Sequence, residues 1–357
     1  MRVLVLWADE RSANLGVRAL AKGSEALLRR VWPDAVVEFQ NFGRGPAPLP
    51  IQTARSLIRA RVTGRAGLQR WLGSYDVVVD TRSGDSFADI YGPRRLETMS
   101  TLAECAREAG AAVVLGPQTI GPFRTPRGRM IGRFSLHRAA LVMARDSESA
   151  RCAAGLGRAV DALTTDVAFA LPATSVPKSR DVVLNISGLL WGGGPHVDGA
   201  EYRRTIAALH RGIVGAGRSV ALLAHVLESA SPDNDVPAIR EFAAEHAPQA
   251  EVIVPASLAD VRDVVASAEV VVGSRMHACL NALSVGTPAI PLAYSRKFAP
   301  LFGDLGWPHT VDLRSNSDPA RDVLRLLDLP ALDSHARAVR DRAHQSLGAA
   351  ESALRGL

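Results

Sequence analysis

Short apolar runs alternate along the whole chain with segments of helical periodicity. Each half of the sequence contains five apolar runs that are long enough to form one buried strand. They cover residues 3–7, 35–40, 76–80, 111–116 and 139–146 in the first half, and 181–188, 219–226, 250–255, 268–274 and 288–294 in the second. Continuous apolar strands separated by helices are typical of parallel sheets built from βαβ units. The pattern therefore predicts an α/β fold.

The length of the chain favours two domains, because 357 residues exceed what one hydrophobic core usually organises. Residues 171–180 contain two prolines and no apolar periodicity, so we interpret them as a linker. We expect Rossmann-like domains at 1–170 and 181–330, followed by an amphipathic terminal helix at 331–357. Two such domains predict a GT-B-like arrangement with parallel sheets, in which ligands bind in the interdomain cleft.

Composition argues against several classes of protein. No apolar run approaches the roughly 20 residues that cross a bilayer, and the first ten residues do not suit a signal peptide. Cys105, Cys152 and Cys279 are far apart, which predicts reduced thiols in a cytoplasmic protein, and no Cys/His spacing suggests a metal site. Aromatic residues make up only 5% and no recognition module is visible, so we do not expect nucleic acid as a partner.

Arginine supplies all but three of the 42 basic side chains, since Lys22, Lys178 and Lys297 are the only lysines. Many of the arginines fall in two stretches, which contain Arg55, Arg59, Arg61, Arg65 and Arg70, and Arg124, Arg127, Arg129 and Arg133. Such stretches fit an ordinary solvated face. They equally fit a surface that meets acidic substrates or anionic lipid headgroups.

The main site candidate follows the fourth apolar run of the second half. Ser274 suits the N-cap of a helix, and Arg275, Met276 and His277 then fall in its first turn. A helix start favours an anion, and a guanidinium adds a forked donor for phosphate or carboxylate. Lys297 follows the fifth run, and parallel strands end at one edge of a sheet. We therefore expect a bound anion here, with His277 either as a proton donor or as a structural histidine.

Polar residues also follow the strands of the first half. Asp85 follows the third run, Gln118 the fourth, and Arg145 with Asp146 ends the fifth. Ligands bind at the carboxyl ends of open parallel sheets, so all four are candidates for a site. A structural role is the alternative, because Asp85 and Gln118 suit loop fixing and Arg145 suits an ion pair with Asp146 or a helix cap. His225, near the end of the second run of the second half, is a further candidate.

Several motifs in this sequence occur together in one known family. They are GDSFADIYG, GPQTIGPF, ARDSESA, TDVAF, LNISGLL and SRMHACLNALSVGTPAIPLAYSRK. In their order they span about residues 80–300, and as an ordered set they are fairly specific. On these motifs the chain resembles the polysaccharide pyruvyl transferase family.

The resemblance implies an enzyme that moves the enolpyruvyl group of phosphoenolpyruvate onto a sugar, forms a pyruvate ketal and releases phosphate. It maps an Arg-hydrophobic-His donor element onto Arg275, Met276 and His277. It also maps a donor lysine onto Lys297 and an arginine onto Arg145. Phosphoenolpyruvate carries a carboxylate beside a phosphate, which agrees with several cations around one helix end. Ketal formation needs a proton on the vinyl carbon, and His277 is the expected general acid.

The remaining expectations follow from the same resemblance. Asp85 and Asp146 become candidates for the base on the sugar hydroxyls, and Ser274 and Gln118 for substrate contacts. The N-terminal domain would hold the acceptor, a sugar or a glycolipid, and the C-terminal domain would hold phosphoenolpyruvate. No cofactor and no metal is expected. A lipid-linked acceptor would bring the two basic stretches to the inner face of the membrane.

The sequence departs from the family pattern at two places, and two other functions remain as alternatives. Asn14-Leu15-Gly16-Val17-Arg18 stands where many members have Asn-x-Gly-Asp-Glu, and Ser83-Gly84-Asp85 stands in place of a glycine triplet, which leaves the acceptor open. One rival function is a GT-B nucleotide-sugar glycosyltransferase or epimerase, in which the glycine run before Pro195 would bind a diphosphate. The other is a non-catalytic module that binds anionic glycans through the arginine-rich face.

Overall fold

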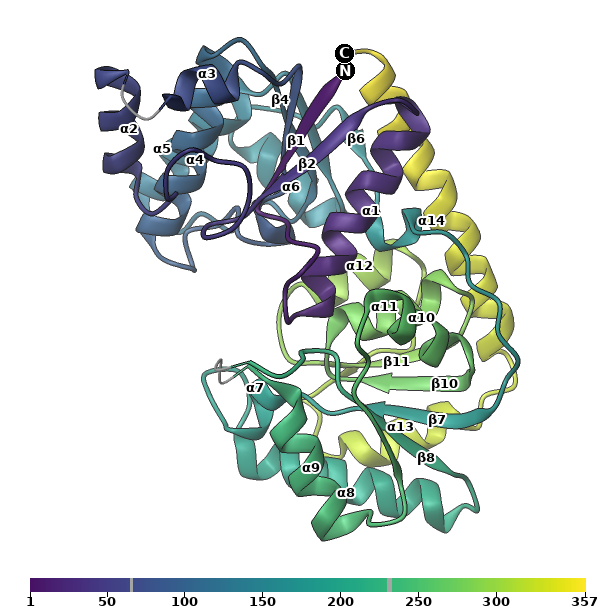
Figure 1. Ribbon diagram of the computed structural model, residues 1–357. Helices are drawn as coiled ribbons and strands as arrows, with labels where there is room; N and C mark the ends of the chain where they lie inside the picture. The colour runs from purple at the N-terminus through teal and green to yellow at the C-terminus, as the bar shows by residue number, and fades with distance from the viewer. Residues whose placement is uncertain (65–66, 230–232) are drawn as a thin grey trace. The chain divides into compact units, whose positions relative to one another are not determined.

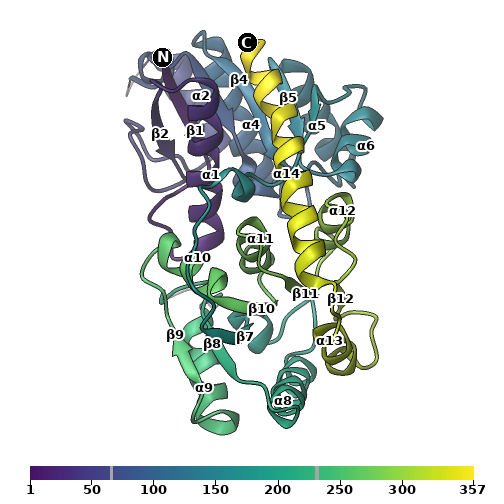
Figure 2. The same cartoon turned by 90° about the vertical axis from the view of Figure 1, so that its right-hand side faces the viewer.

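The protein consists of two compact units. A computed structural model describes residues 1–64, 67–229 and 233–357. Unit 1 comprises Met1–Glu10, Leu20–Leu171 and Ala343–Leu357, and unit 2 comprises Arg11–Ala19 and Pro172–Arg342. Helices α1 (Leu15–Val31) and α14 (Leu332–Arg355) each contain residues of both units (Figure 2).

Unit 1 is built on a six-stranded parallel sheet with the strand order β2-β1-β3-β4-β5-β6. The strands are β1 (Arg2–Leu6), β2 (Val36–Gln40), β3 (Val77–Asp80), β4 (Ala112–Gln118), β5 (Leu141–Ala144) and β6 (Ala162–Leu163). The helices after α1 are α2 (Ala54–Thr63), α3 (Leu68–Leu72), α4 (Pro93–Glu108), α5 (Pro126–Arg138) and α6 (Ser147–Gly155), with short 3-10 turns η2 (Arg82–Gly84) and η3 (Val167–Ala170). Helices α2 to α5 lie on one face of the sheet, and α1 with the end of α14 lies on the other (Figure 1).

Unit 2 repeats this architecture with the strand order β12-β11-β10-β7-β8-β9, again all parallel. The strands are β7 (Arg180–Asn185), β8 (Val220–Leu223), β9 (Glu251–Ile253), β10 (Ala268–Gly273), β11 (Ala289–Ala293) and β12 (Val311–Asp312). The helices are α7 (Gly188–Trp191), α8 (Gly199–Gly215), α9 (Asp235–His246), α10 (Leu258–Ala266), α11 (Met276–Ser284), α12 (Phe298–Asp304) and α13 (Pro319–Leu327). Helices α10 to α12 lie on one face, and α8, α9 and α13 lie on the other (Figure 1).

The prediction of two parallel-sheet α/β domains is confirmed. Each of the ten apolar runs overlaps one strand of the structure. Each sheet also has a sixth strand that the sequence did not indicate, β6 in unit 1 and β12 in unit 2. Both lie at a sheet edge and contain only two residues, which is too short for a periodic signal.

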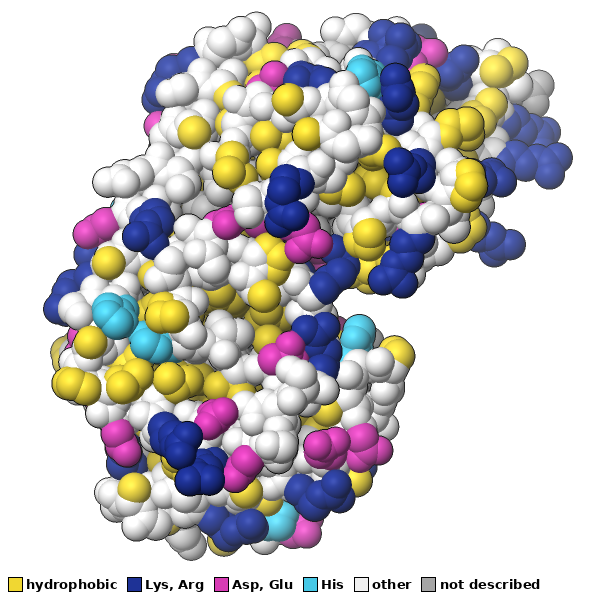
Figure 3. Space-filling model, turned by 180° about the vertical axis from the view of Figure 1, so that it is seen from behind, with side chains coloured by type: hydrophobic (Ala, Val, Ile, Leu, Met, Phe, Trp, Pro, Cys, Tyr) yellow, Lys and Arg dark blue, Asp and Glu magenta, His cyan; other side chains and the backbone are white. Residues whose placement is uncertain are grey.

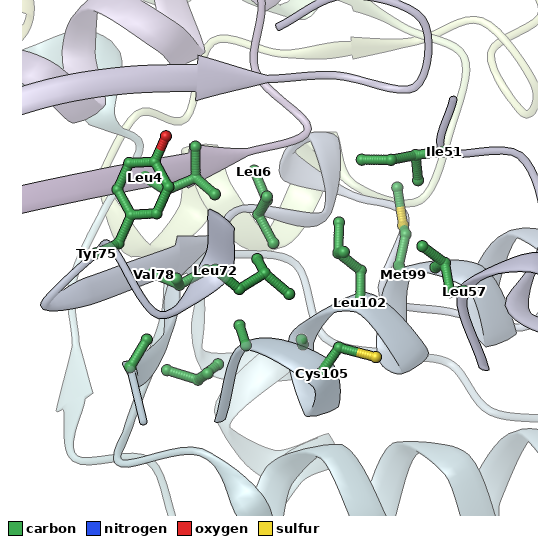
Figure 4. Close-up of a cluster of buried hydrophobic side chains, with 14 of the residues drawn as sticks. Leu4, Leu6, Ile51, Leu57, Leu72, Tyr75, Val78, Met99, Leu102 and Cys105 are labelled. Atoms are coloured by element: carbon green, nitrogen blue, oxygen red, sulfur yellow. The ribbon is translucent and has the colours of Figure 1, made fainter. Parts of the chain in front are cut away.

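Most strands appear in the sequence as unbroken apolar runs because their side chains are buried on both faces of the sheet. Figure 4 shows Leu4 and Leu6 of β1 and Val78 of β3 packed beside Leu102 and Cys105 of α4, and all five side chains are fully buried. The buried positions of α4 recur three or four residues apart, which is the spacing of one helix face. The core of unit 1 therefore forms between its sheet and this face of α4.

We expect Leu102→Ala to lower the free energy of unfolding by about 2–5 kcal/mol, because it leaves a cavity between α4 and the sheet. Chemical denaturation followed by circular dichroism measures the change. Met130→Ala on α5 is the matched control, since Met130 is exposed and its loss should change stability by no more than about 0.5 kcal/mol. Equal effects of the two substitutions would contradict the assigned core.

Candidate active site

Polar residues of unit 2 meet at the carboxyl edge of its sheet. Strands β8, β7 and β10 are parallel neighbours, so their ends lie side by side. Asn185, the last residue of β7, accepts a hydrogen bond from the backbone N–H of Arg275 (2.9 Å) and donates one to the carbonyl of Leu223 (2.9 Å). This buried amide therefore connects the ends of β10 and β8 across β7.

Arg275 lies two residues after the end of β10 and is only 7% exposed. Its Nε and Nη2 donate to Oδ1 of Asp235 (3.1 and 2.6 Å), and its Nη1 donates to Oδ1 of Asp233 (2.6 Å). Burial by itself lowers the pKa of Arg275, but the carboxylates of Asp235 and Asp233 outweigh it and raise the pKa above its ordinary value. The cation that the sequence predicts is thus present, and two carboxylates balance its charge.

Asp235 is the acceptor that these loops share, and its side chain is 0% exposed. Besides Arg275, its Oδ1 accepts from the backbone N–H of Gly188 (2.9 Å). Its Oδ2 accepts from the backbone N–H groups of His225 (3.0 Å) and Val226 (2.9 Å). A buried carboxylate is tolerated only when its oxygens are paired in this way. The segments that follow β7, β8 and β10 are therefore tied to one side chain.

Helix α11 begins one residue later than the sequence predicts. Arg275 occupies the N-cap position, and its side chain makes no capping hydrogen bond. The expectation that Ser274 caps the helix was wrong, because its fully buried hydroxyl lies 2.7 Å from the hydroxyl of Tyr202 on α8. Met276, the first helical residue, is also buried.

His277 lies in the first turn of α11 and is half-buried. The segment Arg11–Ala19 contacts it, since a Cβ on Gly16 would lie 2.8 Å from Nδ1 of His277. Oδ1 of Asn14 accepts from the backbone N–H of Gly16 (2.9 Å) and holds this turn. Glycine at position 16 therefore leaves room for the imidazole.

A second histidine of this edge, His225, is fully buried. Burial lowers its pKa well below the usual range, and the neighbouring His277 and Arg275 act in the same direction. Nη1 of Arg262 donates to Oδ1 of Asn281 (3.4 Å), which orients this amide so that its Nδ2 donates to Nε2 of His225 (3.2 Å). His225 is therefore neutral, with its proton on Nδ1.

Lys297 follows β11 at the same carboxyl edge and occupies the N-cap of α12. Burial and then the charge of Lys297 lower the pKa of His196, so the two side chains are close. The ring of His196 packs edge-on against Tyr294, with 5.3 Å between ring centroids. The end of β11 thus brings together an ammonium group, an imidazole and a phenol.

The other predicted site residues belong to unit 1. Arg145 at the end of β5 is 2% exposed, and it donates from Nε to Oγ1 of Thr119 (2.9 Å) and from Nη1 to Oδ2 of Asp166 (2.9 Å). The ion-pair partner of Arg145 is thus Asp166 rather than Asp146. Gln118 lies next to it, because the carbonyl of Gln118 accepts from the backbone N–H of Arg145 (3.2 Å).

The two carboxylates proposed as bases have local contacts. Asp146 is the N-cap of α6, where its side chain accepts from the backbone N–H of Ser149 (2.7 Å). Asp85 follows η2 and accepts from the hydroxyl of Tyr91 (3.0 Å). Both lie beyond the carboxyl ends of unit 1 strands, as the sequence indicated.

Sequence reasoning did not single out Asn185, Asp233 or Asp235. Asn185 could have been found from the sequence, because it is a polar residue at the end of an apolar run, within LNISGLL. The two aspartates lie in the segment SPDND, whose composition indicates only a turn. Nothing in that segment points to a partner about forty positions later.

Comparison with known proteins identifies one family whose model matches this sequence. The sequence profile described as polysaccharide pyruvyl transferase matches residues 14–296. No curated protein matches the sequence significantly.

Solved structures share the fold at low sequence identity. A protein of Listeria monocytogenes assigned as a UDP-N-acetylglucosamine 2-epimerase has a TM-score of 0.63 and 12% identity, covering 100% of this chain and 97% of its own. MurG of Acinetobacter baumannii has a TM-score of 0.56 and 12% identity, with coverage of 100% and 99%. UDP-GlcNAc 2-epimerase of Methanocaldococcus jannaschii has a TM-score of 0.56 and 11% identity, with coverage of 96% and 100%. These likenesses agree with the predicted GT-B fold class.

We expect Asp235→Asn to lower the free energy of unfolding by about 3–5 kcal/mol, because it leaves the buried Arg275 with less compensation. Urea denaturation measures the change. Glu228→Gln is the matched control, since the carboxylate of Glu228 pairs with Arg240 at the exposed surface and such pairs contribute little. A loss for Asp235→Asn no larger than that of the control would show that the buried pair does not hold this edge together.

Proposed function

The chain belongs to the polysaccharide pyruvyl transferase family, and we propose that it transfers the enolpyruvyl group of phosphoenolpyruvate to two hydroxyls of a sugar. The observation that carries this proposal is the position of His277 and Lys297 at the carboxyl edge of one sheet. His277 lies within the segment that the family profile matches, and Lys297 directly follows that segment. A proton donor and a cation at one sheet edge suit a substrate that carries phosphate and carboxylate.

The proposed reaction proceeds in two additions. A general acid protonates the vinyl carbon of phosphoenolpyruvate, which becomes the methyl group, and C2 becomes electrophilic. One sugar hydroxyl adds to C2, the bond from C2 to the phosphate oxygen breaks, and the second hydroxyl forms the ketal. One of the two hydroxyl protons replaces the proton on the acid, and the other leaves with phosphate. No oxidant or reductant is needed.

The residues of unit 2 supply what these steps require. His277 is proposed as the acid, because its imidazole lies in the first turn of α11 and histidine exchanges protons near neutral pH. Lys297 is proposed to bind the donor phosphate, aided by the positive end of the α11 helix dipole. Neutral His225 avoids adding a further charge beside His277, and we propose a positioning role for it.

The proposed role of Arg275 in donor binding depends on its two carboxylate partners. The Asp235 side chain is 0% exposed, whereas that of Asp233 is 32% exposed. A donor anion that reaches the guanidinium therefore replaces Asp233 and leaves Asp235 in place. We propose that Asp233 competes with the donor for Arg275, and that Asp235 holds the arginine in position.

We propose that residues of unit 1 bind the acceptor. Arg145 and Gln118 are proposed to contact substrate, and Asp85 or Asp146 to accept the proton of a sugar hydroxyl. Asp85 suits that role better, because the carboxylate of Asp146 already caps α6. The acceptor is proposed to be a sugar of a glycan or a glycolipid.

We expect His277→Ala to lower the rate of pyruvyl transfer at least ~100-fold, because general acids contribute that much or more, while donor binding persists. Phosphate release measures turnover, and calorimetry measures the affinity for phosphoenolpyruvate. His246→Ala on α9 is the control and should leave both unchanged. A residual rate above about one tenth of the unsubstituted enzyme would rule out His277 as the acid.

We expect Lys297→Ala and Asp233→Asn to shift donor affinity in opposite directions. Loss of the ammonium removes a phosphate ligand, so the Kd for phosphoenolpyruvate should rise about tenfold or more. Loss of the Asp233 charge removes a competitor for Arg275, so the Kd should fall several-fold. Calorimetry tests both, and an unchanged Kd in both variants would refute the proposed anion site.

A thermal-shift experiment separates this proposal from the nucleotide-sugar alternative. Phosphoenolpyruvate should raise the Tm, because a ligand that binds only the folded state stabilises it. A rise with UDP-N-acetylglucosamine and none with phosphoenolpyruvate would instead favour a nucleotide-sugar enzyme. Glycan binding that persists in His277→Ala without any turnover in the unsubstituted protein would favour a binding module.

A further inference from the structure

A surface groove in unit 1 has no role in the proposed chemistry. It has a volume of about 440 Å³ and lies over α4, with α2 on one side and α5 on the other. Ile58 of α2 and Met130, Ile131 and Phe134 of α5 supply its apolar lining. Three of these side chains are among the exposed large hydrophobic residues of the described chain, and Val62 on α2 is 73% exposed. Apolar side chains gathered on one open surface usually mark a binding site.

The groove also contains two carboxylates, and ion pairs balance both. Glu97 pairs with Arg127 (2.8 Å), and Glu104 pairs with Arg107 (2.8 Å) and Arg138 (2.7 Å). Burial alone would raise the pKa of Glu104, but hydrogen bonds from Arg107 and Arg138 outweigh it and lower the pKa to about 2. Each carboxylate of the groove thus has arginine partners of its own, so it does not cancel the charge of the other arginines.

The helices on both sides of the groove carry further positive charge. Arg55 and Arg59 on α2, and Arg129 and Arg133 on α5, are exposed. Among the residues that the structure describes, no carboxylate forms an ion pair with any of these four. Figure 3 shows basic and hydrophobic side chains intermixed at the upper right of the molecule, the side of unit 1 to which α2 belongs. Exposed arginines from both basic stretches therefore flank one apolar surface, whereas Arg65 of the first stretch lies outside the described residues.

We propose that this groove docks the protein on an anionic lipid bilayer, with the exposed side chains of α2 and α5 entering the headgroup region. Unpaired arginines beside apolar side chains complement a surface that is negative outside and apolar beneath. An acidic glycan would match the arginines but would leave Ile58, Val62, Met130 and Phe134 without apolar partners. A second copy of this chain would bring the same arginines together, which like-charge repulsion disfavours. A bilayer satisfies both features at once.

This docking differs from membrane insertion. No helix within residues 1–64, 67–229 and 233–357 is both long and apolar enough to cross a membrane. Membrane contact would instead arise from surface residues, whose attraction to anionic lipid weakens as salt screens the charges. The proposal does not depend on the proposed reaction, because binding to lipid is measured without phosphoenolpyruvate or acceptor.

Flotation of the full-length protein with vesicles tests the proposal. We expect the protein to float with vesicles of phosphatidylcholine and phosphatidylglycerol, to stay behind with vesicles of phosphatidylcholine alone, and to dissociate at high salt. Arg129→Glu with Arg133→Glu should lower the partition coefficient at least about 30-fold, because each basic residue near an anionic surface contributes about fivefold and charge reversal adds repulsion. Met130→Ser with Phe134→Ser should also lower it, by removing the apolar contact.

Matched controls on α8 separate a local effect from a general charge effect. Arg204→Glu with Arg211→Glu makes the same change in net charge on exposed residues of unit 2, and Val214→Ser removes an exposed apolar side chain there. Both should float as the unsubstituted protein does, and circular dichroism checks that each variant folds. Absence of flotation, or equal loss in the α8 controls, would overturn the proposal. Concentration-dependent self-association that Met130→Ser with Phe134→Ser abolishes would assign the groove to a second copy instead.

Discussion

The ion pair between Asp235 and Arg275 is the interaction on which the candidate site in unit 2 depends. Parallel strands leave their carboxyl ends at one edge, where backbone N–H groups and carbonyls lose their sheet partners. One buried carboxylate accepts from the segments after β7, β8 and β10, and one buried guanidinium satisfies it. Because an unpaired buried charge costs several kcal/mol, neither residue tolerates the loss of the other. This pair therefore anchors the segment just before α11, the helix in which His277 lies.

Unit 1 stabilises its own sheet edge in a similar way. Asp80 at the end of β3 pairs with Arg82 (2.6 Å), and both side chains are fully buried. Arg145 at the end of β5 pairs with Asp166 (2.9 Å), where each side chain is 2% exposed. Arginine suits these positions because its planar group stays charged when buried and presents several donors at fixed angles. This requirement accounts for part of the strong preference for arginine over lysine.

Buried and exposed arginines therefore have different tasks. A guanidinium such as that of Arg145 has its charge balanced by a carboxylate within the protein. Its first role is therefore to hold the surrounding loops in place rather than to attract a ligand. Arg55 and Arg59 on α2 and Arg129 and Arg133 on α5 are exposed, and within the described residues no carboxylate forms an ion pair with them, so their charge is available to an external anion. Arg275 lies between these cases, since one of its carboxylate partners is buried and the other is partly exposed. The number of arginines in a segment does not distinguish these roles. The burial of each side chain and its ion-pair partners do.

Local pattern in the sequence determined the two parallel sheets, the helices between the strands, and the placement of Arg275, His277 and Lys297 at one sheet edge. Periodicity and strand ends are properties of neighbouring residues, so they are visible without coordinates. Only the tertiary structure decided that Asp233 and Asp235 neutralise Arg275, that Gly16 packs on His277, that Ser274 bonds Tyr202, and that α2 and α5 share a groove. These contacts join segments far apart in the chain, and the composition of a segment does not reveal which distant partner will satisfy its buried charges.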